Sequence, residues 1–108
     1  MGGRDPEVDE KKTFSYEEAR ALLPRVRELT DEAVNAVESL PDDGAAGAYQ
    51  QIVASWAEAM IRLGIEVKGL WLVDFDSGSG YYCWKHPEPA LQFFHGYEEG
   101  FGGRVPLQ

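Results

Sequence analysis

The spacing of apolar residues along this chain changes once, at Gly64, and that change limits the folds open to it. Before Gly64, apolar residues recur every three or four positions over residues 19–40 and again over residues 49–63, which places them on one face of a helix. After Gly64 they alternate with polar residues, as they do in strands. The sequence therefore predicts an α+β fold, in which two helices are followed by a small sheet.

The ends of the two predicted helices carry residues typical of caps and turns. Ser15 and Glu18 have capping-box spacing, so the first helix should begin directly after Ser15. Residues 41–44, Pro-Asp-Asp-Gly, predict a turn, and Gly64 stands where a helix C-cap glycine belongs. We therefore expect the first helix to be followed by an antiparallel second helix over residues 45–63.

Pro24 lies inside the apolar stripe of the first helix. Its ring removes one amide donor and crowds the preceding turn, so we expect a bend there or a first segment that ends near Leu23. The second helix is rich in alanine, which would allow close approach of the first helix or of a second copy of the protein.

Two strand-like segments, residues 70–75 and 81–85, flank a Ser-Gly-Ser-Gly loop and predict a hairpin. If Asp76 pairs with Tyr81, then Phe75 faces Tyr82, Asp74 faces Cys83 and Val73 faces Trp84. One face of the hairpin should then pack on the helices, and it carries Trp71, Val73, Phe75, Tyr82 and Trp84. The opposite face carries Leu70, Leu72, Asp74, Cys83 and Lys85.

The rest of the chain completes the predicted architecture. Residues 90–95 are expected to add a third antiparallel strand, because a two-stranded hairpin alone is marginally stable. Residues 96–108 are rich in glycine and predict an ordered loop laid over the sheet. Residues 1–13 predict a flexible tail of mixed charge, and residues 14–108 a single domain built as a helical hairpin on two or three strands.

Charge and composition exclude several classes of partner. With 10 Lys and Arg against 19 Asp and Glu the formal charge is -9, which disfavours nucleic acid and anionic membranes. No apolar run approaches the ~20 residues that span a bilayer, and the N-terminus has no hydrophobic signal region. One cysteine cannot form an internal disulfide, which fits a reducing compartment. We therefore expect a soluble cytoplasmic protein.

Several short motifs occur in an order that resembles a known family. They are Phe14-Ser15-Tyr16-Glu17-Glu18-Ala19, Leu22-Leu23-Pro24, Arg27, Val67-Lys68-Gly69-Leu70, Leu72-Val73-Asp74-Phe75, Cys83-Trp84, Glu88, His95, Gly100-Phe101, Gly103-Arg104 and Pro106-Leu107. Together they resemble an uncharacterised bacterial domain-of-unknown-function family, number 2203, over about residues 14–107. No activity is assigned to that family, so the resemblance implies a grouping and no mechanism. The chain differs from the family in having Pro87 where glycine usually precedes the glutamate.

Polar residues of the last third form the candidate site, and they are Asp74, Cys83, Glu88, His95 and Arg104. Several of them, with His86, are residue types that ligate divalent metals such as zinc or iron, but no spacing matches a compact metal or cofactor motif. The weak candidate ligands are His86, His95, Cys83 and Glu88, and the register places His86 away from the face of Asp74 and Cys83 unless the strand ends at Lys85.

Individual members of this cluster also have simpler structural roles. A facing Asp74 disfavours the Cys83 thiolate, so a buried structural cysteine is expected more than a nucleophile. His95 has two possible roles, a general acid-base group at a strand end or a histidine satisfied by a carboxylate or carbonyl. Arg104 is expected to pair with a carboxylate, either Asp74 or Glu88 within the chain or one on a ligand or partner.

Two functional hypotheses follow. The first is a protein-interaction or assembly module that self-associates or binds a partner through the aromatic sheet and the alanine-rich helix. The alternative is a small metal-binding or small-molecule-processing enzyme that uses the candidate site. Convergence of the five side chains would favour the second hypothesis, and scatter would favour the first.

Overall fold

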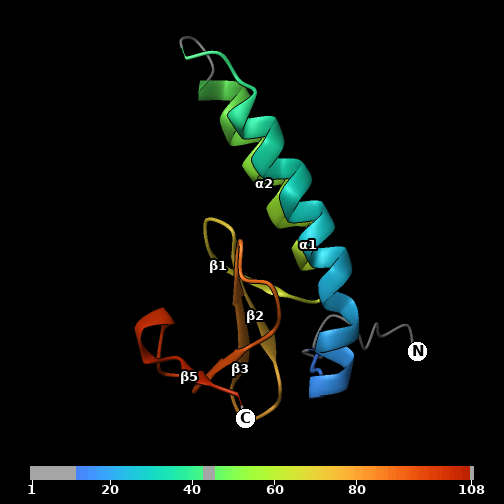
Figure 1. Ribbon diagram of the computed structural model, residues 1–108, viewed down its shortest axis with the longest axis vertical. Coiled ribbons are helices and arrows are strands. Elements are labelled where there is room, and N and C mark those ends of the chain that lie inside the picture. The colour runs from blue at the N-terminus through green and yellow to red at the C-terminus, as the bar shows by residue number, and fades with distance from the viewer. Residues whose placement is uncertain (1–11, 43–45, 108) are drawn as a thin grey trace, which may run out of the picture.

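The computed structural model describes residues 12–42 and 46–107, and within them the chain folds as two helices and a five-stranded antiparallel sheet (Figure 1). The helices are α1 (Tyr16–Glu38) and α2 (Ala46–Arg62). The strands are β1 (Glu66–Gly69), β2 (Leu72–Asp76), β3 (Tyr81–Lys85), β4 (Phe93–His95) and β5 (Val105–Pro106), paired in chain order. The α+β prediction is confirmed. Most of the predicted tail, residues 1–11, lies outside the described residues.

Helix α1 begins as its capping box predicts. The Glu18 amide donates to Ser15 Oγ at 3.0 Å, and the Ser15 amide donates to Glu18 Oε1 at 2.9 Å. The helix then continues through Pro24, so the predicted segment ending near Leu23 is wrong. Leu23 and Val26 are both buried on the core side of this turn, and their packing outweighs the local cost of the proline.

The sequence predicted a turn before α2 and a glycine cap at its end. Residues 43 and 44 of the expected turn at 41–44 lie outside the described residues, and α2 spans Ala46–Arg62, so it ends one residue before the predicted Leu63. Gly64 has φ of 86°, the left-handed conformation of a helix C-cap glycine. The next amide, that of Ile65, donates back to the Met60 carbonyl at 3.0 Å, so Gly64 ends the helix as predicted.

The central hairpin has the predicted register. Asp76 pairs with Tyr81, Phe75 with Tyr82, Asp74 with Cys83 and Val73 with Trp84. The sheet has five strands, however, and the prediction of two or three was too few.

The two unpredicted strands lie at the edges of the sheet. Strand β1 occupies residues 66–69, and a turn at Trp71, whose φ is 59°, separates it from β2, so Leu70 and Trp71 are not strand residues. The C-terminal segment is not a loop throughout. It forms a 3-10 turn at Phe101–Gly103 and then β5, which pairs with β4.

The core lies between the helices and one face of the sheet. Its buried members include Val26, Trp56, Met60, Val73, Phe75 and Trp84. The half of the helical hairpin nearer the interhelical connection projects beyond the sheet (Figure 1). Within the described ranges, neither helix offers an apolar stretch long enough to cross a bilayer.

One buried hydrogen bond joins the two helices. Thr30 Oγ1 accepts from Trp56 Nε1 at 2.8 Å and donates to the Val26 carbonyl at 2.8 Å, and Thr30 is fully buried. A polar group in this position is stable because both of its hydrogen-bonding functions are used.

We predict that Thr30→Val lowers the free energy of unfolding by about 1–3 kcal/mol, because it keeps the shape of the side chain but leaves the Trp56 indole N–H buried without an acceptor. Urea denaturation measures the change. Thr13→Val, at the exposed Thr13 of the N-terminal segment, is the control and should change stability by less than about 0.5 kcal/mol. Equal stability of the two variants would contradict the assigned role of this hydrogen bond.

Candidate functional site

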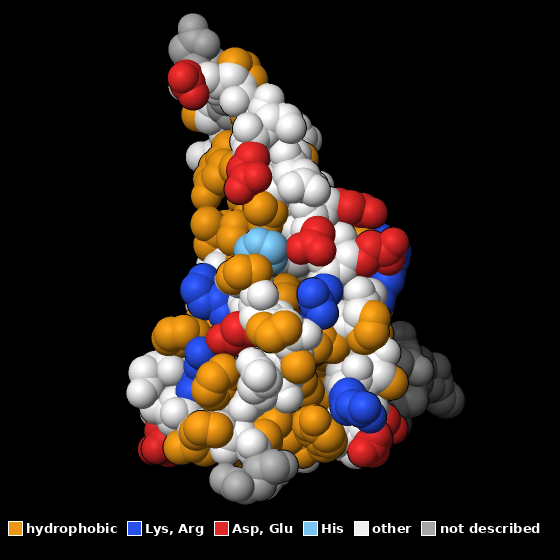
Figure 2. Space-filling model, in the orientation of Figure 1, with side chains coloured by type: hydrophobic (Ala, Val, Ile, Leu, Met, Phe, Trp, Pro, Cys, Tyr) orange, Lys and Arg blue, Asp and Glu red, His pale blue; other side chains and the backbone are white. Residues whose placement is uncertain are grey.

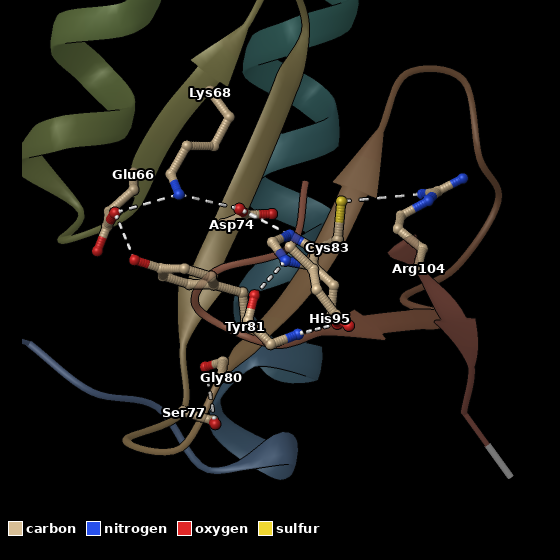
Figure 3. A network of polar contacts seen from close by, with 11 residues as sticks. Glu66, Lys68, Asp74, Ser77, Gly80, Tyr81, Cys83, His95 and Arg104 are labelled. Carbon is tan, nitrogen blue, oxygen red and sulfur yellow. Dashed lines mark hydrogen bonds and ion pairs between the residues drawn. The ribbon is translucent and has the colours of Figure 1, made fainter. Parts of the chain in front are cut away.

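The sheet face turned away from the helices carries a buried polar cluster (Figure 3). Alternation along β2 sends Val73 and Phe75 into the core and Asp74 to the other face. Asp74 and the facing Cys83 are each 1 % exposed, and His95 of β4 is 3 % exposed. Three chemically reactive side chains from three strands are thus shielded from solvent on a face that neither helix covers.

His95 is held in one orientation by hydrogen bonds from both ring nitrogens. Nδ1 lies 2.9 Å from the Gly96 carbonyl oxygen, which can only accept, so Nδ1 carries a proton. Nε2 lies 3.0 Å from Asp74 Oδ2. In a neutral ring Nε2 would also be an acceptor, and two acceptors at this distance repel. With Nδ1 as the donor to Gly96, the contact of Nε2 with Asp74 joins two acceptors unless a proton or another cation lies between them.

The two oxygens of Asp74 have different environments. Oδ2 contacts both His95 and the Lys68 ammonium, whose Nζ is 3.3 Å away. Oδ1 is buried and accepts no hydrogen bond from any group in the described part of the chain. An unsatisfied buried carboxylate oxygen is costly, and it marks this side of the cluster as a place where a positive group would be stabilised.

Cys83 completes the cluster on the central strand. Burial and then the nearby Asp74 carboxylate raise the pKa of the Cys83 thiol to about 12, although Arg104 acts in the opposite direction. At neutral pH the sulfur is therefore a thiol and a poor nucleophile. One ligand atom from each of Asp74, Cys83 and His95 lies within 4.8 Å of the other two, a spacing suited to a shared metal ion.

Arg104 and Glu88 form a second pair beside this cluster. The guanidinium contacts the carboxylate through two nitrogens, Nη1 to Oε1 at 3.1 Å and Nη2 to Oε2 at 2.8 Å. Nη1 also donates to Cys83 Sγ at 3.9 Å (Figure 3). The Phe93 and Phe101 rings lie 3.9 and 4.0 Å from the guanidinium carbon, so the charged group is packed between two aromatic side chains.

The structure brings the five predicted site residues into one connected set. Asp74 and His95 are in direct contact, Cys83 lies beside Asp74, and Arg104 links Cys83 to Glu88. Glu88 therefore reaches the cluster only through Arg104 and is not placed with the three possible ligands.

His86 lies elsewhere. Its Nδ1 is 3.4 Å from the Asp31 carboxylate of α1, and its ring packs edge-on against Trp84. It has no part in the cluster, although β3 ends at Lys85, the one case in which strand alternation did not predict that His86 would point away from Asp74 and Cys83.

Several residues of the network were not predicted. Lys68 lies over the Tyr81 ring at 3.9 Å and contacts Glu66 as well as Asp74, and the Tyr81 hydroxyl donates to Glu66 Oε1 at 3.1 Å. These contacts depend on β1 (Glu66–Gly69), and the alternation of apolar Ile65 and Val67 with polar Glu66 and Lys68 could have indicated a strand here.

A further unpredicted contact is made after β4. The Tyr97 hydroxyl donates to Asp76 Oδ1 at 2.7 Å, which ties the segment that follows β4 to the end of β2. No sequence pattern indicated this pairing.

Fold and site together define an α+β domain with a buried Asp-Cys-His cluster on the sheet face remote from its helices. A family model described as "Uncharacterized conserved protein (DUF2203)" matches residues 42–107, and the chain belongs to this family. The matched range holds α2, all five strands and the whole candidate site, whereas α1 precedes it. No curated protein and no solved structure matches the chain.

We predict that Cys83 of metal-free native protein reacts very slowly with an aromatic disulfide reagent at pH 8. A pKa of about 12 against an ordinary value of 9.0 lowers the thiolate fraction about a thousandfold, and burial further limits access. Absorbance of the released thiol measures the rate, and the same protein in denaturant is the control. Because the chain has one cysteine, rapid stoichiometric reaction in the native state would contradict this assignment directly.

Proposed function

We propose that this domain binds one divalent transition-metal ion, with Zn²⁺ as the first choice, through Asp74, Cys83 and His95. The observation that carries the proposal is the convergence of one oxygen, one sulfur and one nitrogen ligand atom within 4.8 Å on a buried face. Zinc is commonly bound by these three ligand types, and the thiolate disfavours Mg²⁺ and Ca²⁺, which prefer oxygen.

The orientation of His95 supports the proposal. Metal-bound histidines usually donate their second ring N–H to a carbonyl or carboxylate, and the His95 Nδ1 contact with Gly96 is of that kind. Nε2 then offers its lone pair to the cluster, where a metal would supply a positive centre between it and Asp74.

The distances fit a small adjustment of the side chains. Bonds of about 2.0–2.3 Å in tetrahedral geometry separate ligand atoms by about 3.3–3.8 Å. His95 Nε2 and Asp74 Oδ2 are 3.0 Å apart, and all three atoms fall within 4.8 Å of one another. Changes of well under 1 Å in each side chain would therefore suffice.

In the structure, the Lys68 ammonium is the cation that pairs with Asp74. Its ammonium bonds Asp74 Oδ2, but its side chain is 35 % exposed on a flexible stem, so it can move aside at low cost. The Cys83 thiolate and the Asp74 carboxylate would together neutralise a divalent ion. Binding would release the thiol proton.

Burial of the ligands would limit the access of a substrate to the proposed metal. Grooves in the described part of the chain lie beside α1 and α2 and beside residues 89–91, and Asp74, Cys83 and His95 line none of these three. Three protein ligands would leave one of the four tetrahedral positions of zinc open, and burial would keep that position from a large substrate.

Self-association is a second proposal, and the helical hairpin supports it. A groove of largely apolar lining runs between α1 and α2, and its residues include Leu29, Ala33, Ile52, Trp56 and Ala59. Figure 2 shows hydrophobic side chains along the part of the hairpin that projects beyond the sheet. We propose a second copy of the chain as the partner, because a two-fold contact at this groove would remove the apolar lining of both copies from water at once.

The aromatic sheet gives no added support to self-association. Most of its rings pair within the chain, as Tyr82 does with Tyr16 and Phe94, and Tyr81 with Tyr97. The aromatic excess is therefore used inside the domain.

For the metal proposal, we expect chelator-treated protein to bind one equivalent of Zn²⁺ or Co²⁺, with an increase in thermal stability because only the folded state holds all three ligands together. Cys83→Ser and His95→Gln should weaken binding by roughly 100-fold or more, because each removes one of three ligands. Isothermal titration calorimetry measures stoichiometry and affinity. His86→Gln is the matched control and should bind as the wild type does. Absence of stoichiometric binding to folded wild-type protein would refute the proposal.

For self-association, we expect light scattering to give the mass of a dimer at micromolar concentration. Ile52→Asp should shift the population toward monomer, because it places a charge in the apolar groove. Gln50→Asp, at an exposed position on the same helix outside the groove lining, is the control. A strict monomer for the wild type would remove this second proposal.

A further inference from the structure

We propose that Arg104 is a positioning residue for the sulfur of the proposed metal centre, in which its guanidinium holds the Cys83 thiolate by an N–H···S hydrogen bond. The inference rests on the proposed function and adds to it a residue that is not itself a ligand. It is carried by the contact of Nη1 with Cys83 Sγ and by the way in which the guanidinium is fixed.

The guanidinium has little freedom to leave this position. Glu88 binds it through both carboxylate oxygens, and Phe93 and Phe101 lie against it at 3.9 and 4.0 Å. The Arg104 side chain is only 11 % exposed. Glu88 is itself held, because its Oε1 accepts from the Lys85 amide at 2.9 Å. An arginine fixed in this way presents Nη1 to the sulfur without a further loss of side-chain entropy.

The sulfur needs such a partner. A Cys83 thiolate would lie buried beside the Asp74 carboxylate, and two adjacent negative charges are unfavourable until a metal binds. Arg104 remains charged at all relevant pH values and supplies both a positive charge and a donor on the side of the sulfur away from Asp74 (Figure 3).

A donor to a ligating sulfur has two measurable consequences. It stabilises the thiolate lone pairs, so charge transfer from sulfur to a bound metal requires more energy when the hydrogen bond is present. It also favours the metal-bound form, and loss of such partners of a ligand typically lowers metal affinity by about 10–100-fold.

Co²⁺ is the probe, because its thiolate charge-transfer band reports directly on the sulfur. In Arg104→Gln we expect affinity for Co²⁺ to fall by about 10-fold or more and the band to move to lower energy. Arg104→Lys keeps the charge without the planar fork, and it should show a smaller shift in the same direction. The matched control is Arg25→Gln, which removes an exposed arginine of α1 that pairs with Glu28 at 2.7 Å, and it should leave both readouts unchanged.

The outcomes separate this inference from the proposed function. If wild-type protein shows a thiolate band and both Arg104 variants, folded by circular dichroism, keep its energy, Arg104 is only a structural clamp and the inference is overturned, whatever the affinities. If the wild type binds no Co²⁺ or shows no thiolate band, the proposed centre itself fails. A band shift in Arg104→Gln with none in Arg25→Gln supports the inference.

Discussion

The pairing of β2 with β3 is the constraint on which the rest of the structure depends. Strand side chains alternate between faces, so the register that opposes Asp74 to Cys83 also opposes Val73 to Trp84. A slip of one residue in β2 would turn Asp74 into the helix-facing core and Val73 onto the polar face. The register therefore forms the hydrophobic core and the polar cluster in a single step, and neither can be altered without the other.

The polar face is unusual because no helix covers it, yet its charged groups are buried. The chain shields them with its own side chains, with Lys68 over Tyr81 on one side and Arg104 between two phenylalanines on the other. Both shielding groups are cations that contact anionic or readily ionised atoms of the cluster. In a chain of formal charge -9, this local balance is what allows Asp74 to be buried.

The sequence was sufficient for features that depend on local pattern. Alternation and a four-residue loop gave the hairpin register, and the chemistry of Arg104 indicated a carboxylate partner, which is Glu88. Contacts set by the meeting of distant segments could not be read in this way. A carboxylate or carbonyl partner for His95 was expected, but the three-residue strand β4 has too little pattern to fix which residue of β3 it opposes, so Asp74 could not be identified as that partner. Likewise, packing around Pro24 outweighed the local tendency of proline to end a helix, and α1 continues through it.

The same three side chains are compatible with a metal-free state and with the proposed metal-bound state. A metal could therefore be bound without being required for folding. As described, Asp74 is compensated by Lys68 and contacts His95, while Cys83 is a neutral thiol. In the proposed metal-bound state, one divalent ion would replace the thiol proton and would relieve Asp74 of its need for Lys68. The positive charge near Asp74 is similar in both states. The fold can therefore form first, around the β2–β3 register, and present a cluster that is already arranged for a cation.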